Sequence, residues 1–331
     1  MDDTAPGQGK REPEVVSGWS ADRKGARLRL LRRYWLQIFA SGLFLLFLVE
    51  RTLVATGDPN YVPSAILLGA FLVPVTFTTY LYERLPDWEV PLPPLAICFV
   101  WGGVLGTVVA GTLEYDVMKS LGFLPKLGIG VIEEGAKLIL PLAFYFLGRY
   151  RSEAAGILLG VATAMGFAAL ETMGYGFTSL LLSKGNLGVL DGVLLVRGLM
   201  SPAGHAAWTG FVCAVLWRER LKASHATFNW RVGGAFATAV ILHALWDSFA
   251  SMRSATFAAF LSIHLVSLLI ALVSLTLLIR RVREARRATI EGGGPRGEQN
   301  PDLRGVQSDS NVLQHLAGGK AHAERRSRSH Q

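Results

Sequence analysis

The sequence predicts an all-α membrane protein, a polytopic bundle of about eight transmembrane helices with both termini in the cytoplasm. Hydrophobic residues make up 51% of the 331 residues, and charged residues only 18%. The apolar residues occur in blocks of about twenty, the length that a helix needs to cross the hydrocarbon core of a bilayer. Little chain remains for a soluble domain. We therefore expect one integral, multi-pass cell membrane domain at 34–281 between two tails.

The order of polar and apolar segments divides the chain into a tail, eight spans and a second tail. Residues 1–33 are polar and end in a basic stretch, so we expect a disordered N-terminal tail. Residues 282–331 are rich in Gly, Arg, Gln, Ser and His, which is typical of a disordered C-terminal tail. The expected spans between the tails are about 34–55, 61–82, 92–112, 128–148, 155–181, 193–217, 232–251 and 255–280.

The basic residues predict the orientation of these spans. The loops expected on one side of the membrane carry most of them, as in the runs before residue 34 and after residue 279. The positive-inside rule therefore places both termini in the cytoplasm. The net charge of +8 is concentrated at these edges and in the tails. We expect anionic lipid headgroups as partners of the basic edges, and no binding of nucleic acid.

The fourth span is unusual because Glu133, Glu134 and Lys137 lie inside it. Each charge costs about 2.5–3.5 kcal/mol at the centre of a membrane helix, so three in one span require partners or a function. Glu133 and Lys137 are four residues apart and can pair along the helix. Glu134 points about 100° away from Glu133. One lysine cannot fully neutralise both carboxylates, and this indicates a polar site.

Three later spans supply further ionisable groups for this site. Glu171 lies on the fifth span, Arg197 and His205 on the sixth, and His243 and Asp247 on the seventh. Arg197 requires an anion, and one of the glutamates is its expected partner. His243 and Asp247 are four residues apart, so the carboxylate can orient the imidazole. The predicted topology brings these groups to overlapping depths, with the glutamates and Asp247 in the outer half of the bilayer and the two histidines somewhat deeper. We expect one site on spans four to seven, at about 128–252.

The composition of the site favours hydrolysis by an activated water molecule. Carboxylates and histidines can activate water directly or through a bound metal ion. The chain contains no Gly-x-Ser-x-Gly and no His-Glu-x-x-His motif, and a covalent serine or cysteine route is not indicated. Cys98 and Cys213 both lie within apolar spans, where we expect them to be core residues.

The motifs, taken together and in order, resemble the PrsW family of intramembrane proteases, which is related to the CAAX-processing and bacteriocin-processing (Abi) proteases. They are Glu133-Glu134-x-x-Lys137, Phe167-x-x-x-Glu171, His205 and His243-x-x-x-Asp247, within a likeness that covers about 90–252. The CAAX branch more often has arginine in place of Lys137 and histidine in place of Glu171, so the PrsW branch is favoured.

The resemblance implies an intramembrane endopeptidase that cleaves membrane-anchored proteins, in some members an anti-sigma factor at an extracytoplasmic position. It further implies that Glu133 and Glu134 activate water. The remaining implied catalytic residues are Glu171, His205, His243 and Asp247, with Lys137 and Arg197 as supporting residues.

The sequence is compatible with a site that holds a metal ion and with one that does not. A Zn²⁺ ion would have Glu171, His205, His243 and Asp247 as candidate ligands. A glutamic-type site without a cofactor would use Glu134 as the base and a histidine as the oxyanion donor. The carboxylate-rich set favours the second arrangement, because neighbouring carboxylates can divide the roles of acid and base.

Two other function classes are compatible with intramembrane charges. Proton- or ion-coupled transporters use similar residues, and a catalytically silent escort of membrane proteins would leave them unused. The halves of the chain show no evident inverted repeat, which disfavours a transporter. A transport pathway needs polar groups towards both membrane faces, whereas a protease needs one cluster.

Overall fold

The computed structural model describes residues 33–85, 90–120, 125–252 and 256–291. All regular structure in these ranges is helical, which confirms the predicted fold class. The expected disorder of 1–32 and 292–331 concerns residues outside the described ranges. The helices are α2 (Tyr34–Thr56), α3 (Val62–Arg84), α4 (Leu92–Ser120), α5 (Pro125–Lys137), α6 (Ile139–Leu147), α7 (Glu153–Leu182), α8 (Leu187–Met200), α9 (Ala207–Ala223), α10 (Trp230–Ala250) and α11 (Phe257–Glu291).

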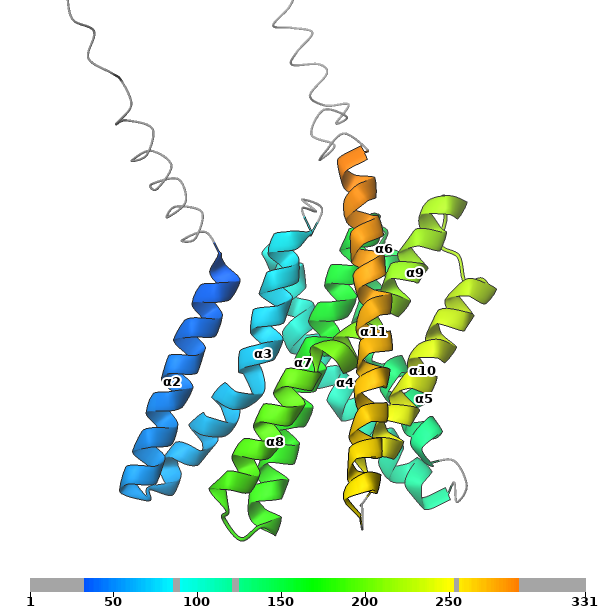
Figure 1. Cartoon of the computed structure of the whole chain (residues 1–331). Coiled ribbons are helices and arrows are strands. Elements are labelled where there is room, and N and C mark those ends of the chain that lie inside the picture. Colours follow the sequence, from blue (N-terminus) through cyan, green and yellow to red (C-terminus); the bar gives the residue numbers. More distant parts are fainter. Residues whose placement is uncertain (1–32, 86–89, 121–124, 253–255, 292–331) are drawn as a thin grey trace, which may run out of the picture.

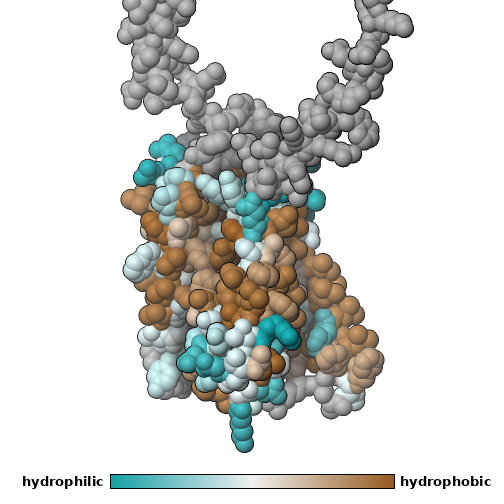
Figure 2. Space-filling model, turned by 90° about the vertical axis from the view of Figure 1, so that its left-hand side faces the viewer, coloured by the Kyte–Doolittle hydropathy of each residue, from teal (hydrophilic) through white to brown (hydrophobic). Residues whose placement is uncertain are grey.

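The helices form a membrane-type bundle around α7. Seven helical stretches of the described chain are long and apolar enough to cross a membrane. α7 is the most enclosed of them and packs against α3, α4, α8 and α9, whereas α2 packs on α3 at the edge of the bundle (Figure 1). Apolar side chains cover the middle of the face shown in Figure 2, and polar residues gather towards its ends. The chain is an integral, multi-pass membrane protein.

The expected fourth span, 128–148, is divided into two short helices. α5 ends at Lys137 and α6 begins at Ile139, so neither is long enough to be counted among the seven stretches. Pro141 gives the physical reason, because it has no backbone N–H to donate to the carbonyl of Lys137. The helix breaks one turn before this proline. The break leaves Lys137 at the last position of α5, in the interior of the bundle.

The two ends of the bundle agree with an even number of crossings. α2 begins and α11 ends on the same side of the bundle (Figure 1). α11 continues to Glu291, so residues 282–291, which the sequence assigned to the C-terminal tail, are helical. The apolar criterion ends a span where arginines begin, but Arg, Glu and Ala are good helix formers and extend the helix beyond it.

Helices α4 and α7 meet at a very close crossing point and then separate. A Cβ atom on Gly166 would lie 1.8 Å from the carbonyl oxygen of Phe99, and one on Gly103 would lie 2.7 Å from the backbone of Gly166. Two turns further along each chain, a Cβ on Gly111 or Gly174 would meet nothing within 4 Å. Glycine allows the backbones to touch at the crossing. Beyond it, the two helices diverge.

Candidate active site

Every residue that the sequence predicted for the site lies on an element that borders one region of the bundle. Glu133, Glu134 and Lys137 occupy the last turns of α5, Glu171 lies on α7, and His243 and Asp247 lie on α10. Arg197 lies in the last turn of α8, and His205 lies on a π-helical turn, Pro202–Ala206, that joins α8 to α9. Pro202 begins this turn, and π-helical turns are common at functional sites.

Lys137 is the centre of the polar cluster. Its side chain is fully buried, and its Nζ lies 3.0 Å from Glu133 Oε2, 2.9 Å from Glu134 Oε1 and 2.9 Å from His205 Nδ1. The predicted pairing with Glu133 is confirmed, but the lysine also joins α5 to the π-helical turn. Because an ammonium group only donates hydrogen bonds, Nδ1 of His205 is the acceptor. His205 therefore carries its proton on Nε2.

Glu134 is sealed inside the cluster, with both carboxylate oxygens in use. Oε1 accepts a hydrogen bond from Lys137 and lies 3.0 Å from Nδ1 of His243. Oε2 accepts a hydrogen bond from the hydroxyl of Thr209, at 3.0 Å. The side chain is 1% exposed. Glu134 thus connects α5 with α9 and α10, and its burial closes it off from a substrate.

Glu171 joins the site from α7 and pairs with the cation that the sequence indicated. Its Oε2 lies 2.8 Å from Nη2 of Arg197 and 3.2 Å from Nε2 of His205. Both distances are short enough for an ion pair, but neither contact has the geometry of a hydrogen bond. Oε2 is therefore a buried acceptor that receives no hydrogen bond from the residues described here. The guanidinium of Arg197 also lies over the ring of Tyr175, 4.0 Å from its centroid.

His243 is held between carboxylates and an aromatic ring. Its Nε2 lies 3.5 Å from Glu133 Oε2 and 3.6 Å from Asp247 Oδ2. The imidazole stacks on Trp208 with ring centroids 4.5 Å apart, and Trp208 Nε1 donates a hydrogen bond to Ser274 on α11. The Asp247 side chain is 29% exposed, so it lies at the rim of the cluster. The predicted His243–Asp247 proximity is observed at a distance too long for a direct hydrogen bond.

A cavity of about 330 Å³ adjoins the cluster where α4 and α7 separate. It contains Glu133 and Glu171, whereas Glu134 does not line it. Its lining residues are Thr107, Ala110, Gly111, Glu114, Glu133, Phe167, Leu170, Glu171, Gly174, Tyr175 and Thr178. The two catalytic candidates that reach open space thus come from α5 and α7.

Sequence reasoning missed three residues of this region. Glu114 lines the cavity, but it lies beyond residue 112, where the third span was expected to end, and so resembled a loop charge; α4 in fact continues to Ser120. Thr209 donates a hydrogen bond to Glu134, and the ring of Trp208 stacks on that of His243. Both follow His205 by about one helical turn, a spacing that could have indicated them.

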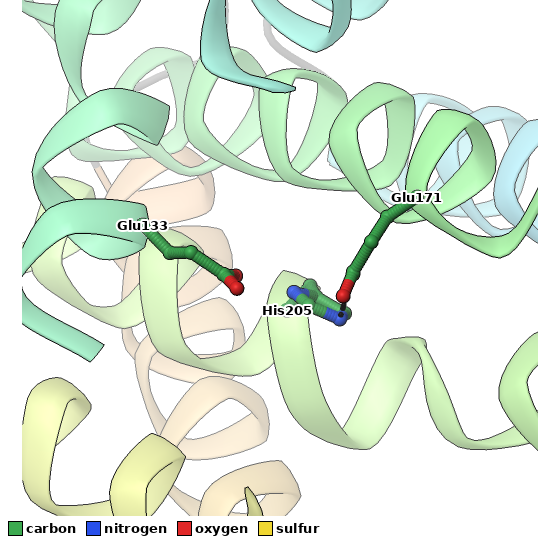
Figure 3. A group of neighbouring side chains, drawn as sticks. All are labelled: Glu133, Glu171 and His205. Atoms are coloured by element: carbon green, nitrogen blue, oxygen red, sulfur yellow. Dashed lines mark ion pairs between the residues drawn. The ribbon is translucent and has the colours of Figure 1, made fainter. Parts of the chain in front are cut away.

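Glu133, Glu171 and His205 are the described residues that come close enough together to hold a metal ion. One potential ligand atom from each lies within 4.8 Å of those of the other two, and the three side chains point towards one another (Figure 3). Three carboxylate and imidazole donors fit a catalytic zinc site, and the unsatisfied Oε2 of Glu171 is a suitable ligand. Lys137 competes for Glu133 and His205. The expected ligands His243 and Asp247 lie outside this group.

Comparison with known proteins gives one match. A family model described as PrsW family intramembrane metalloprotease matches residues 90–278. These residues extend from α4 into α11 and include every polar group of the cluster. No curated protein and no solved structure matches the chain.

Proposed function

The chain belongs to the PrsW family of intramembrane metalloproteases, and from this premise we propose that it is an endopeptidase of membrane-anchored proteins that acts at the cavity between α4 and α7. Membership supports intramembrane proteolysis. The clustering of ionisable groups at one site also supports proteolysis over transport, because a transport pathway needs polar groups towards both faces of the membrane. Anionic lipid headgroups at the basic edges remain part of the proposal.

The observation that carries the mechanism is the different environment of the two adjacent glutamates. Glu133 lines the cavity, whereas Glu134 is sealed by Lys137, His243 and Thr209. A general base must come within hydrogen-bond reach of the water that it activates. We therefore assign this role to Glu133 and a positioning role to Glu134, in place of the sequence-based assignment of the base to Glu134.

In this mechanism Glu133 accepts a proton from a water molecule as the water oxygen attacks the carbonyl carbon of the scissile bond. The same carboxyl group then gives the proton to the nitrogen of the leaving amine as the C–N bond breaks. Lys137 and Glu134 hold Glu133 and His243 in place. Glu171, which pairs with Arg197 of α8, lines the cavity from α7.

A metal ion would be held by Glu133, Glu171 and His205 if the chain uses the chemistry that its family description names. Such an ion would polarise the carbonyl group and lower the pKa of bound water. Glu133 would then be a ligand and not the base, and Lys137 would have to release the ligand atoms that it now contacts. The cavity would admit the substrate in both cases.

The test compares the isosteric variants Glu133→Gln and Glu134→Gln, purified in detergent, on single-span membrane proteins. We expect Glu133→Gln to reduce kcat at least about 100-fold, the lower range for loss of a general base, and to lower the unfolding midpoint because Glu133 forms a buried ion pair with Lys137. Glu134→Gln should lower the unfolding midpoint, because it disturbs a buried ion pair. Cleavage by Glu133→Gln at the wild-type rate would contradict the assignment.

Removal of metal ions by a chelator distinguishes the metal-dependent mechanism from the glutamic-type mechanism. Activity that disappears in chelator and returns with Zn²⁺ supports the metal site at Glu133, Glu171 and His205. Activity that persists after exhaustive chelation, with no bound metal in elemental analysis, supports a glutamic-type site. Lys184→Met, in an exposed loop outside the site, controls for the handling of the variants.

A further inference from the structure

The cavity between α4 and α7 has the form expected of a cleft for an extended polypeptide. We call it the α4–α7 cleft. Its lining residues on α7, from Phe167 to Thr178, lie three or four residues apart and so occupy one helix face. Gly111 and Gly174 line the cavity, and a Cβ atom on either would meet nothing within 4 Å. The backbones of α4 and α7 are therefore accessible from the cavity. Glu133 lies in this cleft, and a chain bound along it passes the proposed base.

Glu114 on α4 is the carboxylate of the cleft that the described structure leaves without a counter-charge. Glu133 pairs with Lys137, and Glu171 pairs with Arg197. Glu114 forms no ion pair with the described residues, and its Oε1 is buried without a hydrogen-bond donor among them. An unpaired carboxylate away from bulk water costs free energy, so a cation or a strong donor in the cleft would stabilise it.

The possible metal site does not account for Glu114. The close group of potential ligands is Glu133, Glu171 and His205, and Glu114 is not part of it within the described chain. Every residue that lines the cleft is acidic, uncharged polar or apolar, so none of them supplies a cation. Since the described residues supply no cation to Glu114, a molecule that enters the cleft can provide the complementary charge.

We propose that Glu114 is a specificity residue that binds a lysine or arginine side chain of the substrate. This inference rests on the proposed peptidase function. The part of α4 that lines the cleft, from Thr107 to Glu114, rises about 10 Å, and an extended chain advances about 3.3 Å per residue. The cleft along α4 therefore matches about three residues of substrate, so we expect the basic side chain within about three residues of the scissile bond. Its aliphatic stem packs along Ala110 and Gly111 while its cationic end reaches the carboxylate.

The test uses a single-span substrate that wild type cleaves, in which one lysine is moved through the three positions on each side of the cleavage site. A matched series carries glutamine at the same positions. We expect wild type to prefer lysine at one position by about tenfold in kcat/KM. Glu114→Gln should abolish this preference, so that the lysine and glutamine series are cleaved with the same kcat/KM. Glu114→Lys should prefer a glutamate at the same position.

The controls separate this inference from the peptidase assignment. Cleavage of the glutamine series by wild type, and its loss in Glu133→Gln, tests the proposed function alone. Glu50→Gln, on α2 and outside the cleft, should leave the lysine preference unchanged. An unchanged preference in Glu114→Gln overturns the inference, as does a wild type without any preference. Loss of all cleavage in a folded Glu114→Gln would also overturn it, because Glu114 would then serve the chemistry.

Discussion

Lys137 shows how single residues organise the site. A buried ammonium group has a large desolvation cost, and this cost is offset only when its donors are all used. Lys137 meets this condition through Glu133, Glu134 and His205, which come from α5 and from the π-helical turn. The lysine therefore fixes the distance between the proposed base and the histidine. Neither element alone could hold that geometry.

Replacement of Lys137 by methionine should remove both stability and activity. Methionine has a similar length, but it leaves two buried carboxylates without their cation, which typically costs about 3–5 kcal/mol. We expect a lower unfolding midpoint in detergent and a loss of cleavage of at least about 100-fold. Lys184→Met serves as the control and should change neither quantity. A Lys137→Met protein with the wild-type unfolding midpoint would show that the cluster is not electrostatically coupled.

At the scale of elements, the site depends on a close helix crossing and a divergence beyond it. α4 and α7 touch at Gly103 and Gly166, and their separation beyond this point opens the cleft. The distance between the two helices is fixed at this contact because no side chain lies between their backbones. The width of the cleft therefore depends on two glycines that lie outside it.

Gly166→Ala should disrupt this crossing. The added methyl group would overlap the carbonyl of Phe99, which belongs to the backbone and cannot rotate away. We expect a loss of about 1–3 kcal/mol or more, seen as a lower unfolding midpoint, together with reduced cleavage. Gly192→Ala on α8, where a Cβ meets nothing within 4 Å, should be neutral or slightly stabilising. Equal midpoints for the two variants would contradict the crossing.

At the scale of the whole molecule, the orientation of the bundle in the membrane determines whether the cleft lies in the outer or the cytoplasmic half of the bilayer. From the positive-inside bias we predict that the end of the bundle where α2 begins and α11 ends faces the cytoplasm. The α2–α3 and α7–α8 connections lie at the opposite end (Figure 1). The α4–α7 cleft, which forms as α4 and α7 run towards that end, would then open in the outer half of the membrane.

Cysteine labelling in intact cells checks this orientation. In a background with Cys98 and Cys213 replaced by alanine, single cysteines are placed at the exposed positions Asn60, Lys184 and His225. A membrane-impermeant maleimide should label the first two from outside and leave His225Cys unlabelled until the cells are opened. The reverse pattern would place the cleft in the cytoplasmic half and exclude extracytoplasmic cleavage.

Much of the molecule follows from properties that are local in the sequence. Bilayer thickness sets the length of the apolar blocks, so the helical class and most spans could be predicted from composition and run length alone. The cost of intramembrane charge identified Glu133, Glu134, Lys137 and Glu171, because such residues persist only with partners or a function. The pairing of Arg197 with a glutamate followed from the same argument.

Tertiary structure decided which of these groups reach open space. Adjacent glutamates are equivalent in sequence, but packing against Thr209 and His243 seals Glu134 and leaves Glu133 in the cleft. Glu114 looked like a loop charge until the continuation of α4 and its divergence from α7 placed it in the same cavity. Local sequence determines the helices and the cost of each charge. Only contacts between distant helices determine which charges are neutralised and which remain available to a substrate.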